Sequence, residues 1–140
     1  KNQWEVVGSD ISTQVLGKAA KGHYPLARNE GIPTALMSKY CLKGVRSQAG
    51  TFLISPELRQ KTRFQQVNLT LPIAADLGEF DVIFLRNVMI YFDMDTKRKV
   101  VANLLPRLKR GGYLLVGHAE TLNGISTALE IIQPTVYRKP

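Results

Sequence analysis

The stretch "FDVIFLRNVMIYFD", from Phe80 to Asp93, places polar side chains where an apolar segment ends. Six mostly apolar residues lead directly to Arg86 and Asn87, apolar residues resume, and Tyr91 follows. A charge and an amide at this point are expected where a strand leaves the core and enters a ligand crevice. The pattern therefore predicts that Arg86 and Asn87 face a bound ligand.

Other polar residues follow apolar segments elsewhere in the chain. Ligands of open α/β sheets bind beyond the carboxyl ends of the strands. We expect four separate segments to converge there through the polar residues at their ends: Asp10, Asn68, Arg86 with Asn87, and His118 with Glu120. His118 is expected to be a core or rim residue without a catalytic part, and Glu120 a helix cap or salt-bridge partner. No group of His and acidic residues has the spacing of a metal site.

Asp10 allows two interpretations. An acidic side chain at the end of a strand can accept hydrogen bonds from the two hydroxyls of a ribose. It can equally be the N-cap of the helix that follows. The Gly-rich phosphate loop that normally precedes such an acid does not occur in this sequence. The pattern alone leaves both interpretations open.

The first elements that must position these residues are a strand, a turn and a helix. "WEVV" predicts a strand over Trp4–Val7 that ends in Gly8-Ser9-Asp10. Ser12 is a plausible N-cap and Gly22 a stop for the next helix. A second, short helix is expected over Pro33–Lys39.

Three β-like pieces follow: "KYCLKGV", "GTFLIS" and "TRFQQVNL". Their close spacing favours antiparallel pairing, because hairpins need few linking residues. We expect a small antiparallel meander, at about 39–68, inserted in a larger α/β unit. Cys41, within the first piece, is expected to be a half-buried strand residue.

The second half alternates strands and a helix. "FDVIFL" reads as a parallel strand buried on both faces. Apolar residues at helical spacing predict a helix that starts at Asp93 and Asp95, is frayed by Pro106 and ends at Gly111-Gly112. "GYLLVGHAE" predicts another buried strand, "ALEIIQP" a weak strand or helix, and "TVYRKP" an edge strand. This alternation predicts an α/β fold with a mostly parallel sheet, whose last strand is antiparallel.

Composition limits the class of protein. The 140 residues suffice for one domain, here a single partial domain over 1–140. No apolar run approaches the roughly 20 residues that span a bilayer, and the start lacks the apolar region of a signal peptide. A single cysteine excludes an internal disulfide and a cysteine-based zinc site, and a cytoplasmic protein is the simplest reading.

The net charge of +8 is unevenly distributed. Residues 11–75 hold nine Lys or Arg and only two acids. Such a region attracts an acidic protein surface or nucleic acid, or it is simply a solvated face. No zinc finger, RNA-binding aromatic motif or long basic helix supports nucleic acid.

The residues quoted so far resemble one family. "FDVIFLRNVMIYFD", followed by an amphipathic helix and "GGYLLVGHAE", is similar to the chemotaxis receptor methyltransferases (CheR). Their pattern is close to F-D-x-I-F-C-R-N-V-M-I-Y-F-D and then G-G/D-G-x-L-x-x-G-H-S-E, from which Leu85 and Ala119 depart. "GSDIST" and "VLGKAAKGHY" resemble the family's segment around Asp10. The resemblance covers about Val6–Arg138.

The resemblance implies a Rossmann-like fold that binds S-adenosyl-L-methionine (SAM). The implied activity is methylation of glutamate side chains of chemoreceptors, with S-adenosyl-L-homocysteine as product. The resemblance implies that Asp10 binds the ribose hydroxyls of SAM and that Asn68 and Leu69 line the adenine side. It also implies that Arg86 and Asn87 contact the methionine end of SAM, and that Tyr91 lies near the transferred methyl group.

The resemblance also implies partners. These are methyl-accepting chemotaxis receptors, through their cytoplasmic helical region and, in some family members, through a C-terminal peptide that docks on the β-subdomain. The basic character of that region suits an acidic receptor surface. Methyltransferases acting on nucleic acid commonly carry an N/D-P-P-Y/F tetrapeptide where this chain has "RNVM", so nucleic acid is not expected as a partner. Insertion into a membrane is not expected either, because no apolar run is long enough.

Parts of the family's pattern have no counterpart in this sequence. Members begin with a helical domain and then a central first strand with a small-residue loop around the methionyl part of SAM. We therefore expect the chain to lack the middle strand of its sheet and to bind SAM weakly or not at all by itself. The alternative function is a non-catalytic fragment or module that binds a receptor or scaffold.

Overall fold

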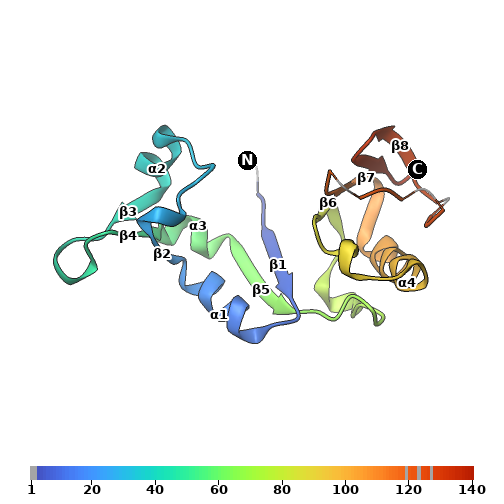
Figure 1. Cartoon of the computed structure of the whole chain (residues 1–140), viewed down its shortest axis with the longest axis horizontal. Helices are drawn as coiled ribbons and strands as arrows, with labels where there is room; N and C mark the ends of the chain where they lie inside the picture. The colour runs from blue at the N-terminus through green and yellow to red at the C-terminus, as the bar shows by residue number, and fades with distance from the viewer. Residues whose placement is uncertain (1–2, 119, 123, 127) are drawn as a thin grey trace. The chain divides into compact units, whose positions relative to one another are not determined.

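The computed structural model describes residues 3–118, 120–122, 124–126 and 128–140. The chain divides into two compact units, Lys1–Val67 and Asn68–Pro140. Each unit has its own sheets and helices, and each is described by itself (Figure 1). Strands and helices alternate along most of the chain, which confirms the α/β class.

The first unit opens with strand β1 (Val6–Asp10) and helix α1 (Thr13–Lys21). The strand starts and ends later than predicted, so Asp10 is its last residue. Both predicted helix boundaries are confirmed. The Ser12 hydroxyl accepts a hydrogen bond from the Val15 N–H at 3.2 Å, and Gly22 ends the helix in a left-handed conformation with φ of 64°.

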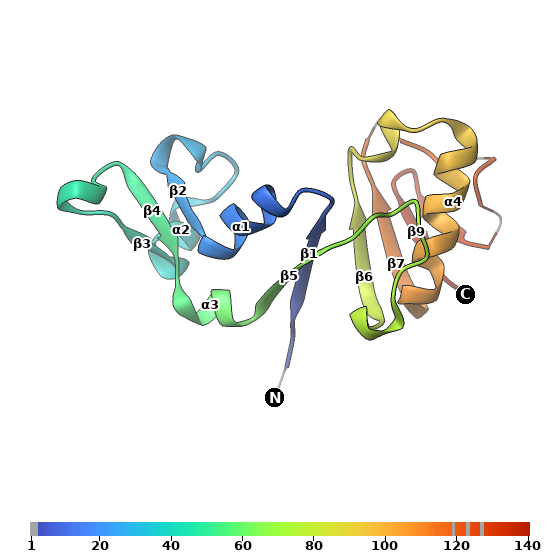
Figure 2. The ribbon, with the colours of Figure 1, turned by 90° about the horizontal axis from the view of Figure 1, so that it is seen from below.

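Strand β5 (Thr62–Gln66) pairs with β1 in parallel, residue for residue. Figure 1 and Figure 2 both show α1 beside this pair. The prediction that the third β-like piece completes an antiparallel meander is therefore wrong. The reason is a helix, α3 (Pro56–Gln60), which separates β5 from the preceding strand and lets the chain cross over before it pairs.

A small antiparallel sheet has the strand order β2-β4-β3. Its strands are β2 (His23–Pro25), β3 (Cys41–Lys43) and β4 (Thr51–Ile54). The first two predicted pieces thus pair as a hairpin, and an unforeseen third strand comes from upstream. Cys41 is half-buried in β3, as predicted.

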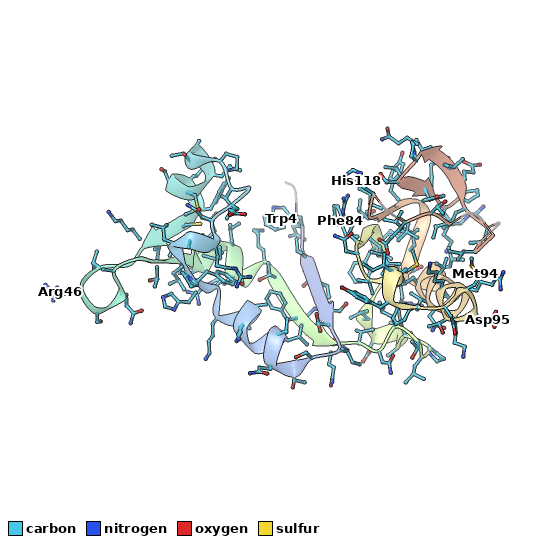
Figure 3. The ribbon with its side chains drawn as sticks, in the orientation of Figure 1. Trp4, Arg46, Phe84, Met94, Asp95 and His118 are labelled. Atoms are coloured by element: carbon cyan, nitrogen blue, oxygen red, sulfur yellow. The ribbon has the colours of Figure 1, made fainter. Side chains whose placement is uncertain are left out.

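Short helices connect these strands, and the predicted helix near residue 33 is confirmed. It is α2 (Thr34–Tyr40), and it follows the 3-10 turn η1 (Leu26–Arg28). A second 3-10 turn, η2 (Arg46–Gln48), lies in the loop between β3 and β4, where Figure 3 shows Arg46.

The second unit contains a four-stranded sheet of order β6-β7-β9-β8. Strand β6 (Phe80–Leu85) runs parallel to β7 (Leu108–Val116). Strands β8 (Glu130–Gln133) and β9 (Val136–Arg138) form an antiparallel hairpin. The prediction of an antiparallel last strand is confirmed, because β9 runs antiparallel to β7. Since β9 pairs with both β7 and β8, the edge strand is β8. The prediction of an edge strand at "TVYRKP" is therefore wrong.

Helix α4 (Met94–Leu104) starts after its N-cap Asp93, as predicted. It gives way to the 3-10 turn η5 (Leu105–Arg107), because Pro106 cannot continue the hydrogen-bonding of the helix. The predicted end at Gly111-Gly112 is wrong, since both glycines already belong to β7. The β6–β7 register shifts between Phe80 and Val82, and the two glycines lie in the irregular part of β7 that results.

The core of the second unit lies between α4 and one face of the sheet. Its buried side chains include Leu85, Leu114, Val100 and Val101. The opposite face of β6 is uncovered within this unit, and Phe84 is 68% exposed. Figure 3 shows Phe84 pointing away from α4, whose first residues are labelled there. The prediction that β6 is buried on both faces is therefore wrong for this unit.

Two 3-10 turns complete the second unit. Turn η3 (Ala75–Leu77) precedes β6, and turn η4 (Met89–Tyr91) follows it. No helix of the described residues is long and apolar enough to cross a membrane.

Candidate functional site

The loop after β6 presents three of the predicted site residues. Leu85, the last residue of β6, is buried, whereas Arg86 and Asn87 directly after it are exposed. Met89 returns to the core at 1% exposure, and Tyr91 ends η4 with 81% of its surface exposed. The prediction that the strand ends at Leu85 and that polar side chains then leave the core is confirmed.

A buried carboxylate holds this loop. Glu120 is 8% exposed, and its Oε1 atom accepts hydrogen bonds from the N–H groups of Asn87 and Gly117, both at 2.8 Å. Its Oε2 atom accepts from the Met89 N–H, also at 2.8 Å. Within the described chain, Glu120 is thus neither a helix cap nor an ion-pair partner, and both of those expectations are wrong. Its partners are the backbones of two loops.

Two backbone positions make this arrangement possible. Asn87 has φ of 60°, in the left-handed region, which Asn tolerates better than most residues. Gly117 has no room for a side chain, because a Cβ atom there would lie 2.6 Å from Glu120 Oε1 and 2.6 Å from Asn87 Oδ1. The close approach of the two loops therefore requires glycine at 117.

Asp93 ends the loop and starts α4. Its Oδ1 atom accepts a hydrogen bond from the Thr96 N–H at 2.8 Å. This bond to the Thr96 backbone, followed by one to the Thr96 side chain, lowers the pKa of the Asp93 carboxyl below its ordinary value of 3.8. The segment that carries Arg86, Asn87 and Tyr91 is therefore fixed at both ends, by Glu120 and by the cap of α4.

Asn68 and Leu69 lie at the start of the second unit. The Asn68 Oδ1 atom accepts from the N–H and the hydroxyl of Thr70, at 3.0 and 2.7 Å. The Leu69 carbonyl accepts from the Asn103 side-chain amide on α4 at 2.9 Å, and its side chain packs against the core. The Asn68 amide N–H groups have no partner among the described residues and can donate to a ligand.

Asp10 lies in the first unit, at the end of β1. Its Oδ1 atom accepts from the Ser12 N–H at 2.9 Å, and the N-cap of α1 is Ser12 itself. The N-cap interpretation of Asp10 is therefore wrong. Its other carboxylate oxygen has no hydrogen-bond partner in the described part of the chain. Binding of ribose hydroxyls stays a prediction, as does convergence with the residues of the second unit.

The remaining candidates contribute little to the site. His118 is exposed in the turn after β7 (Figure 3), so of the two expected positions, core or rim, the core position is wrong. Ala119, one of the two departures from the family pattern, lies outside the described residues. Among residues 3–118, 120–122, 124–126 and 128–140, no group of three or more His, Cys, Asp or Glu is placed to hold a metal ion.

The free polar groups suit a polar ligand with an anionic end. Arg86 has no hydrogen-bond or ion-pair partner among the described residues, although its guanidinium is a strong bidentate donor to carboxylates. In the second unit, the side-chain amide of Asn68 can donate to a heterocycle. In the first unit, the Asp10 carboxylate oxygen that has no partner among the described residues can accept from hydroxyls.

Comparison with known proteins gives a family match along nearly the whole chain. The model of the family described as "CheR methyltransferase, SAM binding domain" matches residues 1–138. The sequence is 38% identical over 133 residues to chemotaxis protein methyltransferase 2 of Pseudomonas aeruginosa, covering 95% of this chain and 48% of that protein. It is 40% identical over 136 residues to the chemotaxis protein methyltransferase of Klebsiella aerogenes, covering 95% and 46%.

The Escherichia coli K12 chemotaxis protein methyltransferase is 33% identical over 135 residues, with 96% of this chain and 47% of that protein covered. The chain thus spans about half the length of the curated relatives it matches. A solved structure, the glycopeptide N-methyltransferase MtfA complexed with SAM, is 21% identical at a TM-score of 0.49, with 98% of this chain and 45% of that chain covered.

Proposed function

We propose that the full-length protein methylates glutamate side chains of chemoreceptors, since the chain belongs to the CheR methyltransferase family. The model of that family matches residues 1–138 of the sequence. The cofactor is SAM. The observation that carries the proposal is the family match, which includes the loop whose Arg86, Asn87 and Tyr91 side chains are exposed. We place this activity in the cytoplasm, where the methylated region of a chemoreceptor lies.

The reaction requires little acid–base catalysis by the protein. A glutamate carboxylate, with a pKa of about 4.3, is already ionised at pH 7, so no general base is needed. When bound, SAM would supply the methyl group, and its sulfonium sulfur would leave as the neutral thioether of S-adenosyl-L-homocysteine. The protein must hold the carboxylate in line, with near-attack distances of about 3–3.5 Å.

The residues of the chain divide this task. We propose that Asp10 accepts from the ribose hydroxyls, that Asn68 and Leu69 line the adenine, and that Arg86 and Asn87 hold the methionine end of SAM. Tyr91, whose side chain is exposed, donates a hydrogen bond that orients the acceptor carboxylate. The excess of basic residues between 11 and 75 then meets the acidic surface of the receptor.

The test is transfer of tritium from methyl-labelled SAM to receptor-containing membranes by the full-length protein. A glutamyl methyl ester is hydrolysed by base and releases volatile methanol, whereas an N-methyl group is stable to base. Base-labile label on the receptor band is the expected result. Membranes without chemoreceptors are the control, and absence of base-labile label from the receptor band would contradict the proposal.

Calorimetry separates the catalytic proposal from its alternative. We expect the 140-residue chain alone to bind SAM weakly or not at all, and the full-length protein to bind it stoichiometrically. Tight stoichiometric binding by the 140-residue chain would show that its residues suffice for the cofactor site. A full-length protein that binds receptors but neither binds SAM nor transfers methyl groups would be a non-catalytic module.

A further inference from the structure

We propose that Glu120 is a positioning residue for methyl transfer, which acts by fixing the loop that presents Arg86, Asn87 and Tyr91. The role of these three residues rests on the proposed function. The fixing of the loop rests on the structure alone, and the two can be tested separately.

The hydrogen bonds of Glu120 are directed at the loop. Its carboxylate accepts from the N–H groups of Asn87 and Met89, on either side of Val88, and from that of Gly117. All three distances are 2.8 Å, and the carboxylate is buried. Hydrogen bonds donated to a carboxylate in such a buried place are stronger than those between neutral groups, because water does not compete for them.

The exposed site residues depend on this backbone. Neither the Arg86 nor the Tyr91 side chain has a hydrogen bond or ion pair among the described residues. Their positions are therefore set by the path of the chain from 86 to 91. At Asn87 that path is left-handed, a conformation that most residues avoid and that the bond to Glu120 helps to hold.

Glutamine at 120 would keep the shape of the side chain and spoil its role as a double acceptor. One of its two terminal atoms becomes an NH₂ group, which cannot accept a backbone N–H. Either the Met89 N–H loses its acceptor, or those of Asn87 and Gly117 do. A donor then faces a donor inside the core, and the loop must move to separate them.

The experiment is Glu120→Gln in the full-length protein. Methyl transfer is measured as kcat and KM with receptor membranes, SAM affinity by calorimetry, and amide hydrogen exchange at Asn87, Met89 and Gly117. A displacement of the loop by about 1 Å should lower kcat roughly 10- to 100-fold. Exchange at these three amides should become faster, while the rest of the second unit stays protected.

Two variants serve as controls. Glu79→Gln makes the same change of charge at an exposed position and should leave kcat, SAM affinity and exchange unchanged. Val101→Ala removes buried volume on α4 without removing any of the hydrogen bonds of Glu120. It should lower the melting temperature while the folded protein keeps its kcat, so it reports what a loss of stability alone does.

A double mutant tests whether Glu120 acts through Tyr91. If it does, Glu120→Gln combined with Tyr91→Phe should be little slower than the slower single variant. Multiplied effects would overturn this link. The proposal as a whole fails if Glu120→Gln lowers the melting temperature as Val101→Ala does but keeps kcat, or if exchange at Asn87 and Met89 does not change.

Two further outcomes are decisive. If Glu120→Gln does not fold, Gly117→Ala disturbs the same carboxylate without removing it, and the same fall in kcat is expected. If the unmodified full-length protein transfers no methyl group, the proposed function fails. Hydrogen exchange then still decides whether Glu120 fixes the loop.

Discussion

A Cβ atom on Gly117 would lie 2.6 Å from Asn87 Oδ1, so the loop after β7 touches the loop after β6 through a glycine. We predict that Gly117→Ala destabilises the 140-residue chain by roughly 1–3 kcal/mol, because atoms must move apart in a packed interior. Chemical denaturation measures this. Gly17→Ala, in the exposed and open middle of α1, should instead stabilise by about 1 kcal/mol. Equal effects of the two changes would contradict the close approach at Gly117.

Asp10→Asn should weaken SAM binding by the full-length protein about tenfold, the typical effect of losing a hydrogen bond to a charged acceptor. The amide oxygen can still accept the bond from the Ser12 N–H, so the turn after β1 is preserved. Calorimetry measures the affinity. Ser12→Ala removes the cap of α1 and should lower stability by about 1 kcal/mol with SAM affinity unchanged. Unchanged affinity in Asp10→Asn would rule out ribose binding by Asp10.

Tyr91→Phe should lower kcat about tenfold and change SAM affinity little, because the phenol orients the acceptor and not the cofactor. The assay is tritium transfer at saturating SAM. Tyr113→Phe is the matched control, since Tyr113 is also exposed but lies on β7, outside the candidate site. A methylation rate that does not change in Tyr91→Phe would remove Tyr91 from the reaction.

Asp93 should contribute to the acid stability of the chain. Its pKa in the folded chain lies below 3.8, so its ionised cap stabilises α4 fully above that pH. The contribution is lost as pH falls from 3.8 through the folded pKa. Asp93→Asn keeps a capping side chain without the ionisable group, so its melting temperature should fall less steeply over this window. Asp76→Asn makes the same charge change outside the cap of α4 and is the matched control.

Two apolar positions of the second sheet should respond differently to truncation. Leu114 is 1% exposed in the core under α4, and Leu114→Ala should destabilise the 140-residue chain by about 2–5 kcal/mol. Phe84 is 68% exposed on the other face, and Phe84→Ala should change stability by less than about 0.5 kcal/mol. Urea denaturation compares them. A large loss in Phe84→Ala would mean that this face is covered in solution.

Local signals predicted much of the fold. Ser12, Gly22 and Asp93 mark helix ends because a side chain or a glycine next to a helix satisfies its terminal backbone groups. Pairing between distant segments was harder. The partner of β5 is β1, more than fifty residues earlier, and the helix that separates β5 from β4 was missed although Ser55, Pro56 and Glu57 form a start signal.

The candidate site was predicted in part. The loop of Arg86 and Asn87 could be located because polar side chains directly after an apolar run mark the point where a strand leaves the core. Glu120 could not be assigned, since its partners are backbone N–H groups, which every residue except proline carries. The local sequence shows only a glycine, Gly117, three residues before an acid, Glu120, and that spacing does not reveal the hydrogen bonds between them.

The three hydrogen bonds of Glu120 also set a condition on biosynthesis. Two of them join the N–H groups of Met89 and Asn87 to a side chain that lies 31 and 33 residues further along the chain. The loop of Arg86 therefore leaves the ribosome well before the carboxylate that fixes it. Until residue 120 has emerged and β7 has paired with β6, nascent chains cannot have a finished site. A stop codon anywhere in α4 would yield a polypeptide that contains Arg86, Asn87 and Tyr91 but lacks the Glu120 carboxylate that fixes their loop.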